Sequence, residues 1–260
     1  MAKPLILVVN DDGHEAAGIH ALAEVARQFG EVCVVSPNIP QSGMGHAITM
    51  NTPLRIYKMH EEPDFSIYRT NGTPADCVKL AEKIILKDRR IDLVVSGINH
   101  GSNSAISIIY SGTMAAVLEA CFDNIPAIGF SLLDHSLNAD FSASKIIAKN
   151  MIEKVLKDGL PSHTGLNINI PKLPFSDIKG IKITRQAAAF WEENLEPRMD
   201  VHGRNYYWYD GDLRNEEPEA EDTDEWALAH HYVSVQPVQF DLTAYHHLQT
   251  LKPWEECFND

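Results

Sequence analysis

The chain has 260 residues, which is enough for one large α/β domain or for a domain with an appendage. Hydrophobic residues make up 44% of it, as in ordinary globular proteins, and this composition excludes overall disorder. With 22 Lys and Arg against 36 Asp and Glu, the net charge is −14, which argues against a nucleic-acid polymer or an anionic membrane as the main partner.

The cysteine pattern and the lack of long apolar runs indicate in which cellular compartment the protein is expected. The four cysteines are scattered without a C-x-x-C pair, which is typical of a reducing environment and not of a disulfide framework. The sequence has no run of about 18 apolar residues for a membrane span and no signal peptide of the usual length. We therefore expect a cytoplasmic protein.

The first strong pattern is an apolar run from Leu5 to Val9 that leads into Asn10-Asp11-Asp12-Gly13. Such a run, bounded by a turn, predicts a strand buried on both faces, as in a parallel sheet. The two carboxylates then come at its C-terminal end, where open α/β sheets bind ligands. In a turn eased by Gly13, both can converge on a hard cation such as Mg²⁺ or Mn²⁺. A surface turn with two solvated aspartates is the alternative.

A helix and a second strand follow. Residues 19–26 have helical spacing, and Gly30 is the expected C-cap. Residues 31–36 predict a strand that Pro37 closes, so the first 36 residues form a βαβ unit with a right-handed crossover. The glycines do not follow G-x-G-x-x-G, so the dinucleotide-binding fingerprint is absent.

The next loop, residues 38–46, contains Ser42, Gly43, Gly45 and His46. Because it follows the second strand, it should lie at the same sheet edge as Asp11 and Asp12. Ser42 can present a hydroxyl to a metal or a phosphate there. Taken alone, this segment is better explained as an ordinary flexible loop.

Short extended segments are expected around residues 48–50 and 65–68, and a helix should begin after Thr73. Thr73 is a good N-cap, Pro74 suits the first helical position, and Asp76 completes a capping box. Capping alone explains these residues.

Residues 91–96 predict another buried strand, which delivers Asn99 and His100 on a loop to the same edge. The amide oxygen of Asn99 suits a hard cation. A single histidine in a loop is more often a surface residue than a ligand, and no second histidine at ligand spacing supports a zinc site.

Ser111, Gly112 and Thr113 precede an apolar helix that begins at Met114. A helix N-terminus has unpaired N–H groups and a partial positive charge, which suit a phosphate. The two hydroxyls add donors, and Gly112 allows close approach to the backbone. A helix cap by Ser111 or Thr113 is the alternative.

Later segments predict strands at 127–131, 167–170, 181–184 and 232–237 and a helix at 141–155. Residues 210–225 hold nine Asp and Glu against Arg214 alone, which favours a solvated loop or arm. The aromatic cluster at residues 206–209 fits a subunit interface or a base-stacking surface, and we favour the interface.

Separate loops thus bring oxygen ligands to the carboxyl edge of the predicted sheet. A helix N-terminus that suits a phosphate is expected at the same edge. Agreement among independent segments is stronger than any single motif. The chemistry that fits is metal-assisted hydrolysis of a phosphate ester.

The same motifs, in order, resemble those of the SurE family, the stationary-phase survival proteins that act as 5′/3′-nucleotidases. The match covers roughly the first half of the chain and continues more thinly through residues 222–224 and 232–234. The matching segments are Asn10–Gly13 with Ala17–Ile19, Gln41–Gly43 with Gly45-His46, Asn71–Val78, Ser96–Asn99 with Gly101 and Asn103, and Tyr110–Thr113.

The resemblance implies a divalent-metal phosphatase of nucleoside 5′- and 3′-monophosphates, and possible action on short polyphosphate. It implies an α/β, Rossmann-like three-layer core with a mostly parallel sheet (residues 1–185) and a C-terminal β-rich arm (186–260) exchanged between the subunits of a homodimer or homotetramer. One Mg²⁺ or Mn²⁺ per subunit is expected. The implied residues are Asp11 and Asp12 (catalytic), Asp11, Asp12, Ser42 and Asn99 (metal), Asn99, Ser111, Gly112 and Thr113 (phosphate), and Gly43, Gly45 and His46 (substrate loop).

The sequence departs from the family pattern without losing an expected metal ligand. Ala105 and Ser107 replace an expected Gly and Asp, Ala120 follows Glu119 where Gly is usual, and His231 replaces a Gly. These changes bear on substrate preference and on the geometry of the arm.

Two alternatives remain at this point. A haloacid-dehalogenase-type phosphatase also begins with a strand and acidic residues, but it spaces them as D-x-D and forms a phosphoaspartate. A nucleotide-binding or assembly module without catalysis is the other, and the intact set of polar sites argues against it.

Overall fold

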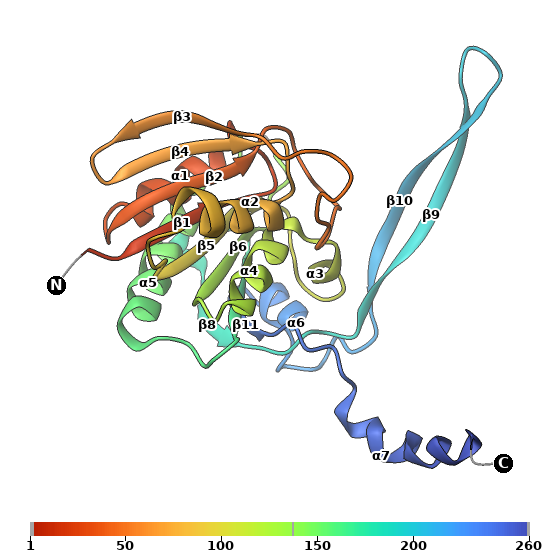
Figure 1. The fold of residues 1–260 in the computed structure, drawn as a ribbon. Coiled ribbons are helices and arrows are strands. Elements are labelled where there is room, and N and C mark those ends of the chain that lie inside the picture. Colours follow the sequence, from red (N-terminus) through yellow and green to blue (C-terminus); the bar gives the residue numbers. More distant parts are fainter. Residues whose placement is uncertain (1–2, 137, 259–260) are drawn as a thin grey trace.

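The computed structural model describes residues 3–136 and 138–258. These residues form a three-layer α/β body around one sheet, from which a long hairpin and a C-terminal tail project (Figure 1). The strands of the sheet are β1 (Leu5–Val9), β2 (Glu31–Pro37), β3 (Ile56–Glu62), β4 (Phe65–Thr70), β5 (Leu93–His100), β6 (Ala127–Leu132), β7 (Gly165–Ile170), β8 (Gly180–Ile183) and β11 (Tyr232–Val238).

The order of these strands is β3-β4-β2-β1-β5-β6-β7-β11-β8. Within this sheet of the described residues, only β3–β4 and β7–β11 pair antiparallel, and the other neighbours are parallel. The predicted α/β class with a mostly parallel sheet is therefore confirmed. β11 is a return strand, because it inserts between β7 and β8 although it lies far beyond them in the sequence.

The side chains of β1 alternate between the two faces of the sheet and supply both halves of the core. Ile6 and Val8 pack in the half that contains α1 (Ala17–Ala26) and α5 (Ser142–Asp158). Leu7 and Val9 pack in the half that contains α2 (Pro74–Leu80) and α4 (Gly112–Phe122). A strand covered on both faces is apolar throughout, and each such buried aliphatic side chain stabilises the fold by roughly 1.5–3 kcal/mol.

The end of α1 differs from the prediction. The helix stops at Ala26 with Arg27 as its C-cap, so Gly30 as the C-cap was wrong. Gly30 instead permits a close backbone contact, since a Cβ there would come within 2.1 Å of the Pro4 carbonyl oxygen.

The predicted start of α2 is confirmed in detail. Thr73 Oγ1 accepts a hydrogen bond from the Asp76 backbone N–H, and Asp76 accepts one from the Thr73 N–H. The helix then continues as a π-helical turn, Ala81–Ile85.

The strand expected around residues 48–50 is absent from the described structure, and β3 forms later. The same capping residues explain this difference: Thr49 donates its backbone N–H to Asp76, and the Ala47 carbonyl oxygen accepts from Thr73 Oγ1. Side chains of α2 thus take backbone groups that a neighbouring strand would otherwise pair.

β5 runs to His100, beyond the predicted end at Ser96. Its pairing with β6 shifts register between Ser96 and Asn99, and Asn99 then pairs with Ser131. The expectation of a loop at Asn99 was therefore wrong, because this irregular pairing depends on a strand distant in sequence.

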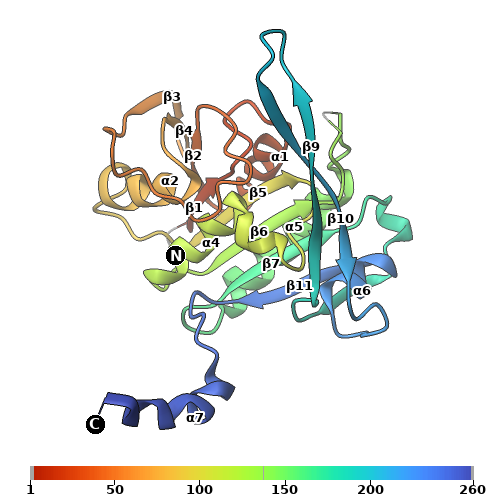
Figure 2. The ribbon, with the colours of Figure 1, turned by 90° about the vertical axis from the view of Figure 1, so that its right-hand side faces the viewer.

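The hairpin consists of β9 (Ala189–Met199) and β10 (Asn205–Asn215), and it stands away from the body (Figures 1 and 2). Residues 210–215, expected as a solvated loop or arm, belong to β10. The remainder of that acidic segment leads into α6 (Asp224–Ala229). Asp224 is buried, and its carboxylate accepts hydrogen bonds from the Ala105 and Ala187 backbone N–H groups. The prediction of a solvated loop was therefore wrong at this residue.

The C-terminal tail leaves the body after β11 and carries α7 (Leu248–Leu251) (Figure 2). Cys33, Cys77 and Cys121 are buried as free thiols, and Cys257 is exposed. In the described residues, we find no helix with the combined length and apolarity that crossing a membrane demands.

Candidate active site at the carboxyl edge of the sheet

The turn after β1 is held by its own side chains. Asn10 Nδ2 donates to the Gly13 carbonyl oxygen at 2.9 Å, and Gly13 adopts a φ of 96°, which favours glycine. This turn brings Asp11 and Asp12 to the carboxyl edge of the sheet, next to the central strands β1 and β5.

Asp11 is a buried carboxylate with one side-chain partner in the described structure. Thr113 Oγ1 donates to Asp11 Oδ1 at 2.7 Å, so the start of α4 is joined to the end of β1. Burial raises the pKa of Asp11 to about 6, although the Thr113 hydroxyl opposes this shift and the neighbouring Asp12 adds to it.

Asp12 is partly buried, and its Oδ2 atom is enclosed without a hydrogen-bond partner among the described residues. Burial raises the pKa of Asp12, and the nearby His100 partly offsets the shift. A buried acceptor without a partner costs about 1–3 kcal/mol, and more when it is charged. A bound cation would relieve that cost.

His100 is not the free surface residue expected from sequence. It is half-buried, its ring packs edge-on against Phe141 with centroids 5.2 Å apart, and its Nδ1 is enclosed. Its proximity to Asp12 could not be read from its position in the sequence.

The loop that carries Ser42 is attached to the turn and to α4. Gln41 donates its N–H to the Asp11 carbonyl oxygen at 2.7 Å, and Gly45 donates to the Tyr110 carbonyl oxygen at 3.0 Å. Ser42 lies between these anchors and is exposed. Gly43 has a φ of 73° and open space where a Cβ would be.

A buried glutamate that the sequence did not single out holds the end of this loop. His46 Nε2 lies 2.9 Å from Glu119 Oε2, and Lys79 pairs with the other oxygen of Glu119. Burial would raise the pKa of Glu119, but the hydrogen bonds from His46 and Lys79 outweigh it and lower the pKa. In the sequence, Glu119 is a charged residue within an otherwise apolar helix, and this signal could have identified it.

Asn99 lies on β5, the parallel neighbour of β1, at the same edge. The Asn99 Nδ2 atom donates to the Gly101 carbonyl oxygen at 2.9 Å. The Oδ1 atom of the same amide is therefore available to a ligand.

The loop after Asn99 rests on buried amides: Asn169 Oδ1 accepts from the Asn103 N–H at 2.8 Å, and Asn103 Nδ2 donates to Ser131 at 2.8 Å. The sequence reasoning placed Asn169 on a strand without a role, although the alternation of Asn167 and Asn169 with isoleucines was an available signal.

The start of α4 is close to Asp11. Ser111 caps the helix, since its Oγ accepts from the Met114 N–H at 3.1 Å, and this confirms the capping alternative. Its own hydroxyl proton is still available to a ligand. A Cβ on Gly112 would come within 2.7 Å of Asp11 Cβ, so glycine is needed for this approach.

The residues present fit a hard cation. Among the described residues, no group of three or more His, Cys, Asp or Glu side chains could hold a metal ion. A cation at Asp11 and Asp12 would therefore need other oxygens, and a hydroxyl such as that of Ser42 and an amide such as that of Asn99 have the right chemistry.

Two departures from the family pattern occupy left-handed backbone. Ala105 has a φ of 48° and His231 a φ of 69°, and both stand where glycine was expected. Both backbones therefore keep the conformation that glycine favours, at the cost of some strain.

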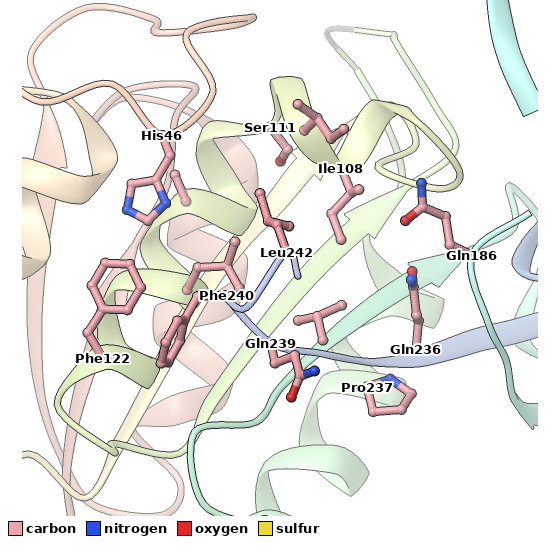
Figure 3. A pocket seen from close by; sticks show the side chains of 14 residues that line it. His46, Ile108, Ser111, Phe122, Gln186, Gln236, Pro237, Gln239, Phe240 and Leu242 are labelled. Atoms are coloured by element: carbon pink, nitrogen blue, oxygen red, sulfur yellow. The ribbon is translucent and has the colours of Figure 1, made fainter. Parts of the chain in front are cut away.

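A cavity of about 510 Å³ lies beside Ser111 on the outer side of α4 (Figure 3). His46 stacks on Phe122 with ring centroids 5.5 Å apart, and Phe240 packs edge-on against Phe122 at 4.9 Å. The aromatic rings of this cavity therefore contact one another.

The fold and site define a class: a three-layer α/β protein with an oxygen-rich ligand site at the carboxyl edge of its parallel sheet. The chain belongs to the SurE family, since the model of that family, Survival protein SurE, matches residues 6–193. The resemblance seen in the motifs is thereby confirmed.

Relatives match over nearly the whole chain. It is 53% identical over 256 residues to the 5′-nucleotidase SurE of Flavobacterium psychrophilum (98% of this chain, 99% of that protein). It is 55% identical over 254 residues to that of Christiangramia forsetii (97% of each). The crystal structure of the Sure protein from Aquifex aeolicus superposes with a TM-score of 0.84 at 40% identity, covering 97% of this chain and 100% of that one.

Proposed function

We propose that this chain is a 5′-nucleotidase: a divalent-metal-dependent phosphatase that hydrolyses nucleoside 5′- and 3′-monophosphates to nucleoside and phosphate. The names of its relatives support the activity. The observation that carries metal dependence is the enclosed, unpartnered Asp12 Oδ2 beside the buried Asp11.

In this proposal Asp11, Asp12, Ser42 and Asn99 hold one Mg²⁺ or Mn²⁺ per subunit. The cation would screen the phosphoryl oxygens and lower the pKa of a bound water. Thr113 orients Asp11 through its hydroxyl, and Gln41 fixes the Ser42 loop to the Asp11 backbone.

The phosphate is assigned to the start of α4. The first N–H groups of a helix have no intrahelical acceptor, so those of Gly112 and Thr113 suit phosphoryl oxygens. The Ser111 hydroxyl and the Asn99 side chain add donors. These groups would stabilise the charge that spreads over the equatorial oxygens as the ester bond breaks.

Water attacks phosphorus directly in this proposal, without a phosphoaspartate. Asp11 has one oxygen committed to Thr113, and both carboxylates serve as metal ligands, so neither acts as the nucleophile. An acid-stable phosphoenzyme trapped on Asp11 or Asp12 would contradict this mechanism.

The proposal extends to short polyphosphate and to a homodimer or homotetramer that exchanges the segment 186–260. Exposed aromatic residues on the hairpin and tail support the assembly, because Tyr207 and Trp254 are 58% and 68% exposed. Loss of the oligomer on deletion of the hairpin, followed by light scattering, would test it.

The activity is tested by phosphate release from a panel of 5′- and 3′-nucleotides and polyphosphate. We expect turnover with Mg²⁺ or Mn²⁺ that EDTA abolishes, and a large loss in Asp12→Asn. Unchanged turnover of that variant at limiting metal would refute the metal site.

A further inference from the structure

We propose that a second cavity, between the Ser42 loop and the hairpin, binds the base of the nucleotide substrate. This inference rests on the proposed function. The cavity has a volume of about 600 Å³, within the usual range for small-molecule sites, and we call it the hairpin pocket. Its walls include Gly43, Tyr110, Trp191, Glu193 and Tyr209.

The hairpin pocket adjoins the residues assigned to metal and phosphate. Gly43 follows Ser42 and Tyr110 precedes Ser111, and neighbouring Cα atoms are about 3.8 Å apart. The hydrogen bond from the Gly45 N–H to the Tyr110 carbonyl oxygen, at 3.0 Å, joins the two segments. In a nucleoside monophosphate only the ribose separates base and phosphate, so a base should lie this close.

Two aromatic residues of the hairpin, Trp191 and Tyr209, lie on the same face. Glu193 pairs with Gly211 and Leu195 pairs with Tyr209 across the two strands. Because alternate residues of a strand share a face, Trp191 and Glu193 lie on the same face as Tyr209 and Gly211. A Cβ on Gly211 would come within 2.3 Å of the Glu192 carbonyl oxygen, so glycine permits the close approach of the two strands here.

The aromatic rings that line the hairpin pocket are partly exposed, and one of them is held in place by a hydrogen bond. Trp191 is 44% exposed, Tyr209 is 76% exposed and Tyr110 is 49% exposed. Trp191 Nε1 donates to Ser107 Oγ at 3.2 Å, so the hairpin is fastened to α3 (Ser107–Tyr110), the short helix before Ser111. Ser107, one of the departures from the family pattern, thus contacts the proposed base site.

The chemistry of the walls selects a base over a phosphate. Every nucleobase has an aromatic face, so stacking on aromatic side chains accepts different bases. Glu193 and Asp210 can accept hydrogen bonds from base or ribose N–H and O–H groups, but they would repel a phosphate. The phosphate is therefore directed to the start of α4 and the base to the hairpin.

The cavity beside Phe122 is the rival location for a base. His46 stacks on Phe122, and Phe240 packs edge-on against the same ring at 4.9 Å. Phe122 and Phe240 are 43% and 40% exposed, less than Tyr209 of the hairpin pocket at 76%.

The test compares a nucleotide with the same phosphate ester without its base. We would measure kcat/KM for AMP and for ribose 5-phosphate, with Mg²⁺ or Mn²⁺, in wild type, Trp191→Ala and Tyr209→Ala. The matched control is Trp208→Ala, which removes an exposed aromatic residue from the opposite face of the same strand. Phe240→Ala tests the rival cavity, and light scattering follows the oligomer of every variant.

For AMP we expect a loss of roughly 10-fold in both pocket variants, as for one lost stacking contact, and none in Trp208→Ala. Ribose 5-phosphate turnover should be unchanged in all of them. Equal losses for both substrates would overturn the inference, and so would a loss in Phe240→Ala alone. Equal losses together with a smaller oligomer would make this face a subunit contact.

Failure of the proposed function gives a different result. If the wild type releases phosphate from neither ester, the 5′-nucleotidase proposal is refuted. Calorimetric titration with adenosine then tests the pocket by itself: binding that Tyr209→Ala weakens and Trp208→Ala preserves supports it, and the absence of binding overturns it.

Discussion

Replacing Asp12 by Asn should stabilise the metal-free protein and remove its stabilisation by Mg²⁺ or Mn²⁺. In the described structure Asp12 Oδ2 is enclosed without a hydrogen-bond partner, and burial raises the pKa of this carboxyl group. An unsatisfied buried acceptor costs about 1–3 kcal/mol, and more for a charge. Asn keeps the shape without the charge, although its amide also lacks a partner.

We therefore expect Asp12→Asn to gain about 1 kcal/mol without metal, which corresponds to a Tm rise of roughly 2–4 °C for a chain of this size. In the wild type, a cation at 100 times its Kd should add about 2.7 kcal/mol, or roughly 5–10 °C. The variant should lose most of that shift, because one of two carboxylate ligands is gone.

Scanning calorimetry of both proteins, in EDTA and in excess Mg²⁺ or Mn²⁺, measures both effects without an activity assay. The control is Asp88→Asn, since Asp88 is an exposed carboxylate away from the active edge. A variant that is less stable than the wild type in EDTA and still gains the full metal shift would refute the assignment of Asp12.

Other regions give further expectations. Thr113→Val removes the hydroxyl donated to Asp11 and should lower kcat about 10-fold with the fold intact, as judged by circular dichroism, whereas Thr113→Ser should retain activity. Burial and the adjacent Asp123 raise the pKa of Glu82 from 4.5 to about 7, so the folded protein keeps a proton there that the unfolded chain loses, and stability falls as pH rises from 4.5 to 7. The advantage of Glu82→Gln in urea unfolding should grow by about 2 kcal/mol over that range, and a constant difference would contradict the shift. Replacing residues 190–214 by a short Gly linker should reduce the mass in light scattering, and an unchanged mass would count against the hairpin as a subunit contact.

Local patterns were sufficient for much of the body. The run Leu5–Val9 predicted β1 with its bounds, because a strand covered on both faces has no polar positions. The Thr73 capping box predicted the start of α2, because a cap depends on residues within one turn. The ordered motifs also identified the family.

The sequence patterns gave wrong predictions where the backbone of a segment forms its hydrogen bonds with residues outside that segment. Residues 48–50 have strand-forming residues, but the Thr49 backbone N–H donates to the Asp76 side chain, and the carbonyl oxygen of the preceding Ala47 accepts from Thr73. The acidic character of residues 210–225 concealed the end of β10, residues 210–215, because the strand with which they pair lies outside the acidic segment.

The sequence by itself determined which residues belong at the carboxyl edge, since each follows a recognisable strand or opens a recognisable helix. Only the tertiary structure decided what they contact. Asp11 and Thr113 are 102 positions apart, and their hydrogen bond forms because β1 and α4 pack in one layer of the core. Trp191 and Tyr209 likewise share a face through the register of their two strands, which hydrogen bonding between the backbones sets.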